Sequence, residues 1–372
     1  MNDHRLRAAV ISAGMIACKA HIPAYMNMKD RVEVAGVCDS NGAAAKSAAE
    51  HFAIPYYYDD AKRMLEDLQP DLVSVCTPNV SHKPLVTMAL ENGAHVVCEK
   101  PLSLTYAQTK ELFDLAGSVG KKLIACQTLR YMTEFAAAKE LVDTQDFGKL
   151  YFSEINLIRR RGIPKWGTFH LMDSSGGGCF CDLGVHMIDA VLWIMGNPSF
   201  EAISGSSAAY IGRGESDIYT SLAESGAPAG VENARPYAPE EFEVEEFAAG
   251  SIRLGGGIRV NFKISWAVNL PGEFNINIAG SKAGLSIPKM EMYTTVGRYQ
   301  ADIKPRVFKE DKYGAEAFSG HFYLLEDTVN CLTGRGELPV KPRETLNVAA
   351  VIEAFYLSAQ KGREVPASEV IK

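Results

Sequence analysis

The stretch that decides the fold is ISAGMIACKAHIPAY, residues Ile11–Tyr25. It ends an apolar run that begins at Leu6, and it opens a helical pattern. A turn of the form G-x-G-x-x-G/A at such a place lets backbone N–H groups and a helix N-terminus meet a pyrophosphate. Here the three slots hold Ser12, Gly14 and Ala17, so serine replaces the first glycine. An ordinary strand–turn–helix without a ligand is the alternative interpretation.

The next apolar run supports a dinucleotide site. Val32–Asp39 ends in a carboxylate that can accept hydrogen bonds from an adenosine ribose diol. Ser40 and Asn41 follow it, with no arginine, so a 2′-phosphate would meet an uncompensated negative charge. We therefore expect NAD, with NADP the less favoured cofactor. The residues expected at this part of the cofactor are Ser12, Gly14, Met15, Ile16 and Asp39.

Residues 1–127 alternate short apolar runs with helical patterns. Strands that are apolar on both faces and alternate with helices predict a doubly wound parallel sheet of the Rossmann type. The predicted strands are Leu6–Ser12, Val32–Asp39, Leu72–Thr77, His95–Glu99 and Leu123–Gln127. The predicted helices are Ala43–Phe52, Asp60–Leu68, Ser81–Asn92 and Thr105–Ala116.

Two of these strands end in chemically suggestive segments, CTPNVSH (Cys76–His82) and CEKPLS (Cys98–Ser103). Ligands of open α/β sheets bind beyond the carboxyl ends of the strands. Lys100, held before Pro101, can direct its ammonium into such a cleft, although a surface lysine paired with Glu99 is the alternative. The further residues expected at the cofactor are Thr77, Pro78, Asn79, His82, Glu99, Lys100 and Gln127.

The pattern changes after about residue 130. Alternating strand-like stretches predict a second α/β domain, residues 128–317, with a large open and mostly antiparallel sheet. Residues 211–241 predict a long exposed loop, and the chain becomes helical again from His321. The predicted strands are Leu150–Ile158, Phe200–Tyr210, Val244–Leu254, Gly257–Ala267 and Glu273–Ala279.

The segment GGGCFCDLGVHMID, residues Gly176–Asp189, allows two interpretations. Asp182 could cap a helix whose solvated face carries His186 and Asp189. Alternatively, Asp182 and His186 could form a proton-transfer pair, in which a carboxylate orients an imidazole that titrates near neutral pH.

Composition narrows the class of protein. The 372 residues suggest two domains, and a net charge of −7 without a basic block argues against nucleic-acid or anionic-membrane partners. We find no apolar run of roughly 18 residues and no apolar leader, so neither a membrane span nor secretion is expected. The eight cysteines lie mostly in apolar runs, which favours a reducing cytoplasm, and Cys179-x-Cys181 lacks zinc-site spacing. We therefore expect no metal.

The turn ISAGMIA, followed by CTPN, EKP and GGGxxxDLGxHMxD, resembles the glucose–fructose oxidoreductase and inositol dehydrogenase family (Gfo/Idh/MocA) over essentially the whole chain. The resemblance implies an NAD-dependent oxidoreductase with Lys100, Asp182 and His186 as its catalytic residues. It also implies that the helices of about residues 318–372 return to the first domain. Assembly through exposed sheet faces, as a homodimer or homotetramer, is a further implication.

The substrate expectation rests on RRRGIPKWGTFH, Arg159–His170, where an aromatic ring beside fixed donors suits a sugar or cyclitol. His186 would take the hydroxyl proton while Lys100 steadies the same oxygen. A solvated strand end is the alternative for the arginines, and a core anchor for the tryptophan. An NAD-dependent glycosidase that oxidises transiently and then eliminates is the alternative function. The residues expected at the substrate are Lys100, Arg130, Tyr131, Arg161, Trp166, Asp182 and His186.

Overall fold

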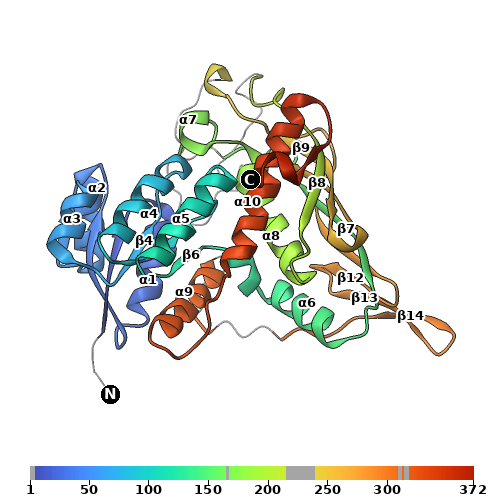
Figure 1. The fold of residues 1–372 in the computed structure, drawn as a ribbon, viewed down its shortest axis with the longest axis horizontal. Helices are drawn as coiled ribbons and strands as arrows, with labels where there is room; N and C mark the ends of the chain where they lie inside the picture. The colour runs from blue at the N-terminus through green and yellow to red at the C-terminus, as the bar shows by residue number, and fades with distance from the viewer. Residues whose placement is uncertain (1–4, 165–166, 215–238, 309–311, 314–317) are drawn as a thin grey trace. The chain divides into compact units, whose positions relative to one another are not determined.

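The computed structural model describes residues 5–164, 167–214, 239–308, 312–313 and 318–372 (Figure 1). They fall into two compact units, each built on its own sheet. The first unit comprises Met1–Tyr131 and Asp311–Thr345, and the second comprises Met132–Glu310 and Leu346–Lys372. The chain therefore enters each unit twice and ends in the second.

The first unit contains a six-stranded sheet in the order β3-β2-β1-β4-β5-β6. Every strand pair in it is parallel. This is the strand order of a doubly wound dinucleotide-binding sheet, as the sequence predicts. The strands are β1 (Leu6–Ile11), β2 (Val32–Cys38), β3 (Tyr56–Tyr58), β4 (Leu72–Val75), β5 (His95–Cys98) and β6 (Leu123–Ala125).

Two hydrophobic cores of the first unit cover the two faces of this sheet. One packs Val10 and Leu72 against Ile22 and Phe322, and the other packs Ile11 among residues such as Leu90. Because Phe322 lies in α9, this helix packs on the first sheet. The helices are α1 (Ile22–Met26), α2 (Gly42–Phe52), α3 (Ala61–Leu68), α4 (His82–Glu91), α5 (Tyr106–Ser118) and α9 (Ser319–Leu332), with the π-helix η1 (Ala17–His21) before α1.

Side-chain caps define where three of these helices begin. Asn41, Asp60 and Thr105 each accept a backbone N–H from the first turn of α2, α3 and α5, respectively. Such caps satisfy donors that have no partner inside the helix. The local sequence thus fixes the helices between the strands and, with them, the strand ends at which the candidate site residues lie.

The second unit contains a nine-stranded sheet in the order β14-β13-β12-β11-β7-β10-β9-β8-β15. Its pairs are antiparallel except β10 with β7, so the predicted mostly antiparallel sheet is confirmed. In β10 buried and exposed residues alternate, as in a sheet with one solvated face. The strands are β7 (Leu150–Ile158), β8 (Phe200–Ala208), β9 (Phe247–Leu254), β10 (Ile258–Ser265), β11 (Glu273–Gly280), β12 (Gly284–Ile287), β13 (Glu291–Val296), β14 (Tyr299–Ile303) and β15 (Val365–Pro366).

The helices of the second unit are α6 (Thr133–Thr144), α7 (Met172–Ser175), the π-helix η4 (Phe180–Gly184), α8 (Val185–Ile194) and α10 (Pro342–Lys361). The ring centroid of Phe180 lies 4.9 Å from that of Phe262 and 3.9 Å from that of Phe355, which seats η4 in the core. The helical stretch Met172–Ile194 is long and apolar enough to span a membrane, but 83% of its most apolar window is buried inside the structure. It therefore has the character of a core helix.

The structure differs from the sequence expectations in four places. Residues 346–372 belong to the second unit, where β15 pairs with β8, so only residues 311–345 of the tail join the first. Asp182 lies inside a π-helix and is not an N-cap, because the helical turns begin before it. The strands β3, β12, β13, β14 and β15 were not predicted. Most of the loop predicted at 211–241 lies outside the described residues.

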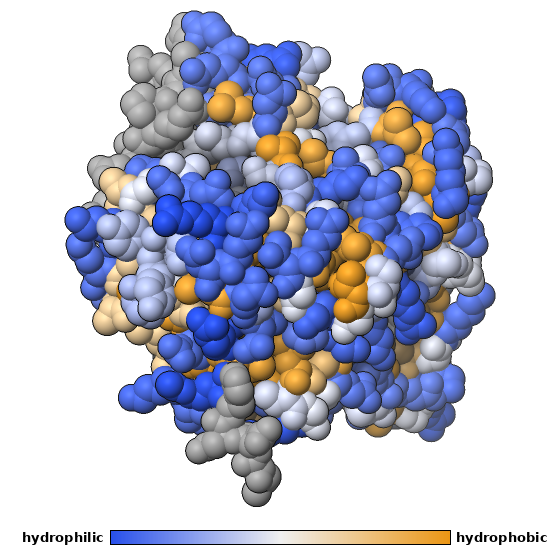
Figure 2. Space-filling view, turned by 60° about the vertical axis from the view of Figure 1, so that its left-hand side comes forward, coloured by the Kyte–Doolittle hydropathy of each residue, from blue (hydrophilic) through white to orange (hydrophobic). Residues whose placement is uncertain are grey.

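The surface seen in Figure 2 is mainly hydrophilic, and its hydrophobic residues form small, separate patches. Scattered exposed apolar residues of this kind are ordinary for a folded protein.

Candidate functional site

The predicted pyrophosphate turn lies between β1 and η1. Ser12 has φ 103°, a conformation that glycine adopts easily and other residues adopt under strain. Its hydroxyl oxygen accepts the Gly14 N–H at 3.0 Å, which occupies one donor of the turn. A Cβ at Gly14 would lie 3.2 Å from that same oxygen, so the turn has little space for a side chain there. Ser12 thus keeps the shape of the glycine turn at a conformational cost.

Asp39 follows β2 and closes this turn from the other side. Its Oδ2 accepts the Ala13 N–H at 2.8 Å, and its Oδ1 accepts the Asn41 N–H at 2.9 Å. Each carboxylate oxygen has a second lone pair that can accept a hydroxyl proton. The turn and the expected ribose-binding carboxylate are therefore brought together, as the sequence predicts.

Two polar atoms after β4 and β6 have no hydrogen-bond partner among the described residues, namely Thr77 Oγ1 and Gln127 Oε1. Both are buried, and an unsatisfied buried polar atom costs about 1–3 kcal/mol. Both residues follow strands of a parallel sheet at its carboxyl edge, where ligands of such sheets bind. These atoms fit a polar ligand such as NAD. Pro78, which is exposed, and Asn79 continue the same segment after β4.

The EKP segment follows β5 at the same edge. The Glu99 N–H continues the sheet by bonding the Val75 carbonyl at 2.9 Å, and the Lys100 N–H lies 3.3 Å from Glu99 Oε2. The Glu99 side chain is buried, and its pKa lies well below the ordinary value. Burial opposes this shift, but hydrogen bonds from His21 and His321 outweigh it. Sequence reasoning missed this carboxylate–histidine group, because His321 is 222 residues away from Glu99.

His82 lies in α4, where its side chain is fully buried. Its Nδ1 is 2.7 Å from the Pro101 carbonyl oxygen, and its Nε2 is 2.9 Å from the Thr77 carbonyl oxygen. The ring therefore connects the segments that follow β4 and β5. Its expected contact with the cofactor stays a prediction, whereas its support of the two turns is observed.

Asp182 and His186 belong to the second unit, in η4 and α8. The Trp266 Nε1–H donates to Asp182 Oδ2 at 3.1 Å. Trp266 is fully buried just after β10, so its hydrogen bond ties the Asp182 carboxylate to the end of a sheet strand. The sequence shows this tryptophan 84 residues from Asp182 and gives no sign of the contact.

Glu245 holds the glycine-rich start of η4. Its carboxylate accepts the N–H groups of Gly178 and Phe180, each at 2.9 Å, and the Tyr356 hydroxyl at 3.0 Å. Burial raises the pKa of this carboxyl, and these donors oppose the rise. A Cβ at Gly178 would lie 1.9 Å from the Glu245 carbonyl oxygen, and a Cβ at Gly177 2.2 Å from the Tyr356 hydroxyl. The glycines are thus required by packing, a local reason that the sequence reasoning did not find.

The remaining substrate candidates have different surroundings. Arg130 is buried, and its Nη1 lies 2.6 Å from Glu344 Oε2, while the Tyr131 hydroxyl donates to Asp327 at 2.8 Å. Arg161 donates to Asn269 Oδ1 at 2.7 Å and to the carbonyl of the preceding residue at 2.6 Å. These contacts support structural roles, and substrate contact by the three stays a prediction. Trp166 lies outside the described residues.

Both domains match models of one oxidoreductase family. Residues 6–126 match the family's NAD-binding Rossmann domain, and residues 139–367 match its C-terminal α/β domain. The chain belongs to the Gfo/Idh/MocA oxidoreductase family. The resemblance seen in the sequence is therefore confirmed.

Relatives in this family act on sugars. The chain is 29% identical to D-glucoside 3-dehydrogenase of Escherichia coli strain K12, over 98% of each chain. It is 24% identical to D-apiose dehydrogenase of Paraburkholderia graminis, over 97% of this chain and 89% of that one. The WlbA dehydrogenase of Bordetella pertussis, solved in complex with NADH and UDP-GlcNAcA, has the same fold, with a TM-score of 0.75, 20% identity, and coverage of 98% and 99% of the two chains.

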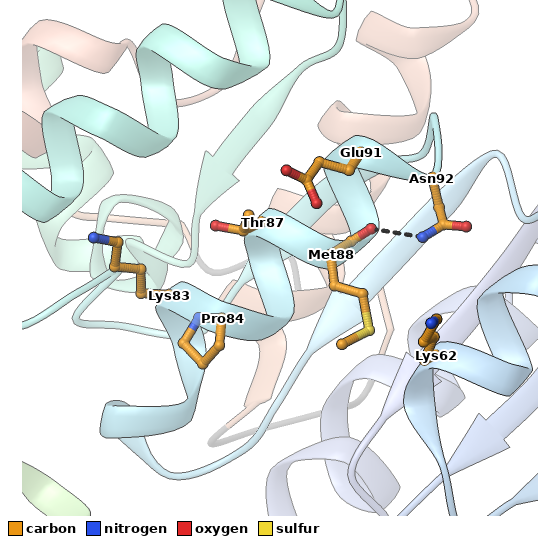
Figure 3. Close-up of a pocket in the computed structure, with 7 residues that line it drawn as sticks. All are labelled: Lys62, Lys83, Pro84, Thr87, Met88, Glu91 and Asn92. Atoms are coloured by element: carbon orange, nitrogen blue, oxygen red, sulfur yellow. Dashed lines mark hydrogen bonds between the residues drawn. The ribbon is translucent and has the colours of Figure 1, made fainter.

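A surface pocket of about 490 Å³ lies along α4 in the first unit (Figure 3). It contains none of the family motif residues. On one wall of the pocket, the Asn92 side-chain amide donates to the Met88 carbonyl at 2.9 Å and caps the C-terminal end of α4. We assign it no role in the reaction. Its lining residues are Lys62, Lys83, Pro84, Thr87, Met88, Glu91 and Asn92.

Proposed function

We propose that this protein is an NAD-dependent dehydrogenase that interconverts a secondary alcohol and a ketone on a sugar, sugar derivative or cyclitol. The observation that carries the proposal is the Trp266 hydrogen bond to Asp182. Through this bond Trp266, which is buried at the end of a strand, holds the Asp182 carboxylate. The interpretation of Asp182 as a helix cap then has no support. Whole-length likeness to D-glucoside 3-dehydrogenase makes a glucoside the first substrate to test.

In the proposed mechanism His186 acts as the general base. An imidazole titrates near neutral pH, so it can take the hydroxyl proton of the alcohol and return it in the reverse reaction. Lys100 donates a hydrogen bond to the same oxygen and stabilises its developing negative charge. Asp182, which Trp266 holds, orients His186. NAD, when bound, supplies the acceptor for the hydride.

The cofactor preference follows from Asp39. A 2′-phosphate at the ribose would face a carboxylate whose oxygens already order the turn at Ala13 and Asn41. We expect reduced cofactor to form from NAD and not from NADP when a panel of glucosides, free sugars and cyclitols is tested by absorbance. The double variant Asp39→Ala with Ser40→Arg should shift the preference towards NADP, because it removes the repulsion and adds a phosphate partner. A wild-type protein that prefers NADP would contradict the ribose assignment.

We also propose that the protein is a homodimer or homotetramer that assembles through its second sheet. One large apolar residue, Tyr293 of β13, is 45% exposed on the face of this sheet opposite to that of the buried Met292. Light scattering after size exclusion should give at least twice the 40.5 kDa mass of one chain. A charged replacement at Tyr293 should lower that mass, and a monomeric wild-type protein would refute the assembly.

A further inference from the structure

Glu99 is the centre of a buried group in the first unit. Its Oε1 lies 2.9 Å from His21 Nε2 and 3.1 Å from His321 Nε2. His21 ends η1, Glu99 follows β5, and His321 lies in the first turns of α9. Segments from three distant parts of the chain therefore meet at one carboxylate oxygen.

The hydrogen bonds of this group form one consistent chain. The low pKa of Glu99 makes it a carboxylate, which only accepts, so both histidines donate from Nε2. Burial lowers the pKa of His21, which is then neutral and accepts at Nδ1 from the Ser74 hydroxyl at 3.0 Å. Ser74 in turn lies 2.7 Å from the Tyr25 hydroxyl, which serves as its donor. The group is satisfied without any further ligand.

The same side chains include ligand types that zinc prefers. Cys126 Sγ lies 3.9 Å from His21 Nε2, and His21, Glu99 and Cys126 could together hold an ion. Zinc requires a thiolate, however, and burial raises the pKa of Cys126 well above its ordinary value. The contacts of Glu99 are those of hydrogen bonds. These observations favour the hydrogen-bonded group over a metal site.

Hydrogen bonds with three histidines fix both neighbours of Lys100 in the chain, Glu99 and Pro101. On one side, Glu99 Oε2 accepts the Lys100 N–H at 3.3 Å, while Oε1 is held by the two histidines. On the other side, the Pro101 carbonyl oxygen is 2.7 Å from His82 Nδ1. Since Glu99 is also bonded to β4 through its N–H, the turn is tied to the sheet, to α4 and to α9.

We propose that His21, His82 and His321 are positioning residues for Lys100, which act by fixing Glu99 and Pro101 on either side of it. The proposal rests on the proposed function, in which Lys100 contacts the reacting oxygen. Small displacements of a catalytic group can cost up to about 10²-fold in rate, so a loosened turn should lower kcat without weakening cofactor binding.

The test compares three variants of the full-length protein. His321→Ala removes one donor to Glu99, and His321→Gln restores an N–H donor at that place. His95→Ala is the matched control: His95 begins the same strand, β5, at its opposite end, where its ring accepts the Lys122 N–H. Each variant is measured for kcat, for KM of the sugar, for Kd of NAD, and for hydrogen–deuterium exchange of the peptide that contains Lys100.

For His321→Ala we expect kcat to fall about tenfold, within the range that misplacement produces, while KM and Kd change less than about twofold. The Lys100 amide should exchange faster, because its acceptor is no longer fixed. His321→Gln should recover most of both effects, and His95→Ala should show neither. An unchanged kcat, or an equal effect of His95→Ala, would overturn the proposal.

Two further outcomes can be distinguished from those of the variant comparison. If the wild-type protein oxidises no sugar, the proposed function fails, and the exchange rates alone decide whether the histidines fix the turn. Elemental analysis of the purified protein should find it free of zinc. About one zinc per chain, lost in Cys126→Ser, would replace the hydrogen-bonded group by a metal site and overturn the proposal.

Discussion

Ser12 is the residue at which this chain departs from the G-x-G-x-x-G/A pattern of a dinucleotide-binding turn. It occupies the place of the first turn glycine with φ 103°, and its hydroxyl oxygen accepts the Gly14 N–H. Residues held in such conformations cost of order 1–3 kcal/mol. The internal hydrogen bond compensates for part of this strain, but it competes with a phosphate oxygen for the same donor.

Ser12→Gly should therefore stabilise the protein by about 1 kcal/mol, because the strain disappears while glycine's entropic cost is about 0.5–1 kcal/mol. It should also tighten NAD binding about threefold, since the Gly14 N–H becomes available and a net hydrogen bond contributes about 0.5–1.5 kcal/mol. Titration calorimetry and thermal unfolding measure the two effects. Ser12→Ala is the control, because it frees the donor but keeps the strain. Equal stability of the two variants would contradict the strain argument.

At the scale of single residues, the sequence predicts the functional residues that lie within one short segment. Asp39 and the glycine turn lie close together because both follow adjacent parallel strands, a rule that needs only strand order. Trp266 and His321 act on Asp182 and Glu99 from 84 and 222 residues away, and no local pattern marks them. Tertiary packing alone brings these partners together.

The element that carries the motif is the helical stretch Met172–Ile194, made of α7, η4 and α8. The sequence predicts a helix here but places its start at Asp182. The structure instead has a π-helix at Phe180–Gly184, whose N–H groups at its start are bonded by Glu245. π-Helical turns are frequently found at functional sites. A side chain at either of the glycines before it would collide with Glu245 or Tyr356.

Gly178→Ala should accordingly destabilise the protein by about 1–3 kcal/mol, the usual cost of overpacking, because its Cβ would lie 1.9 Å from a backbone oxygen. Turnover should fall as well, since the Asp182 N–H donates to the Gly178 carbonyl at 2.9 Å. Gly117→Ala is the matched control: Gly117 lies in α5 with nothing within 4 Å of an added Cβ, and alanine there should stabilise by up to about 1 kcal/mol. Chemical denaturation compares the two. If Gly178→Ala were as stable as wild type, the packing role of the glycines would be refuted.

At the scale of the whole molecule, the fold class and the two sheets follow from the sequence, but the course of the tail does not. The pattern shows helices after His321 without showing which sheet each one covers. In the structure α9 packs in the core of the first sheet, and Phe355 of α10 packs on Phe180 in the second unit. Helical periodicity identifies a buried face but not its partner. The same limit applies to the parallel pair β7 and β10, because strand pairing depends on the connections between strands.

The central claim is that the protein, acting through Lys100 and His186, transfers hydride from a sugar to NAD. The most direct measurement follows reduced cofactor and oxidised sugar together, for wild type, Lys100→Ala and His186→Ala, with a glucoside as the first substrate. We predict equal amounts of NADH and keto-sugar from wild type. Each variant should lose at least about 10²-fold in turnover while still binding NAD, because general acid–base catalysis contributes roughly 10²–10⁴-fold. Release of free sugar without net NADH, or wild-type turnover in either variant, would contradict the claim.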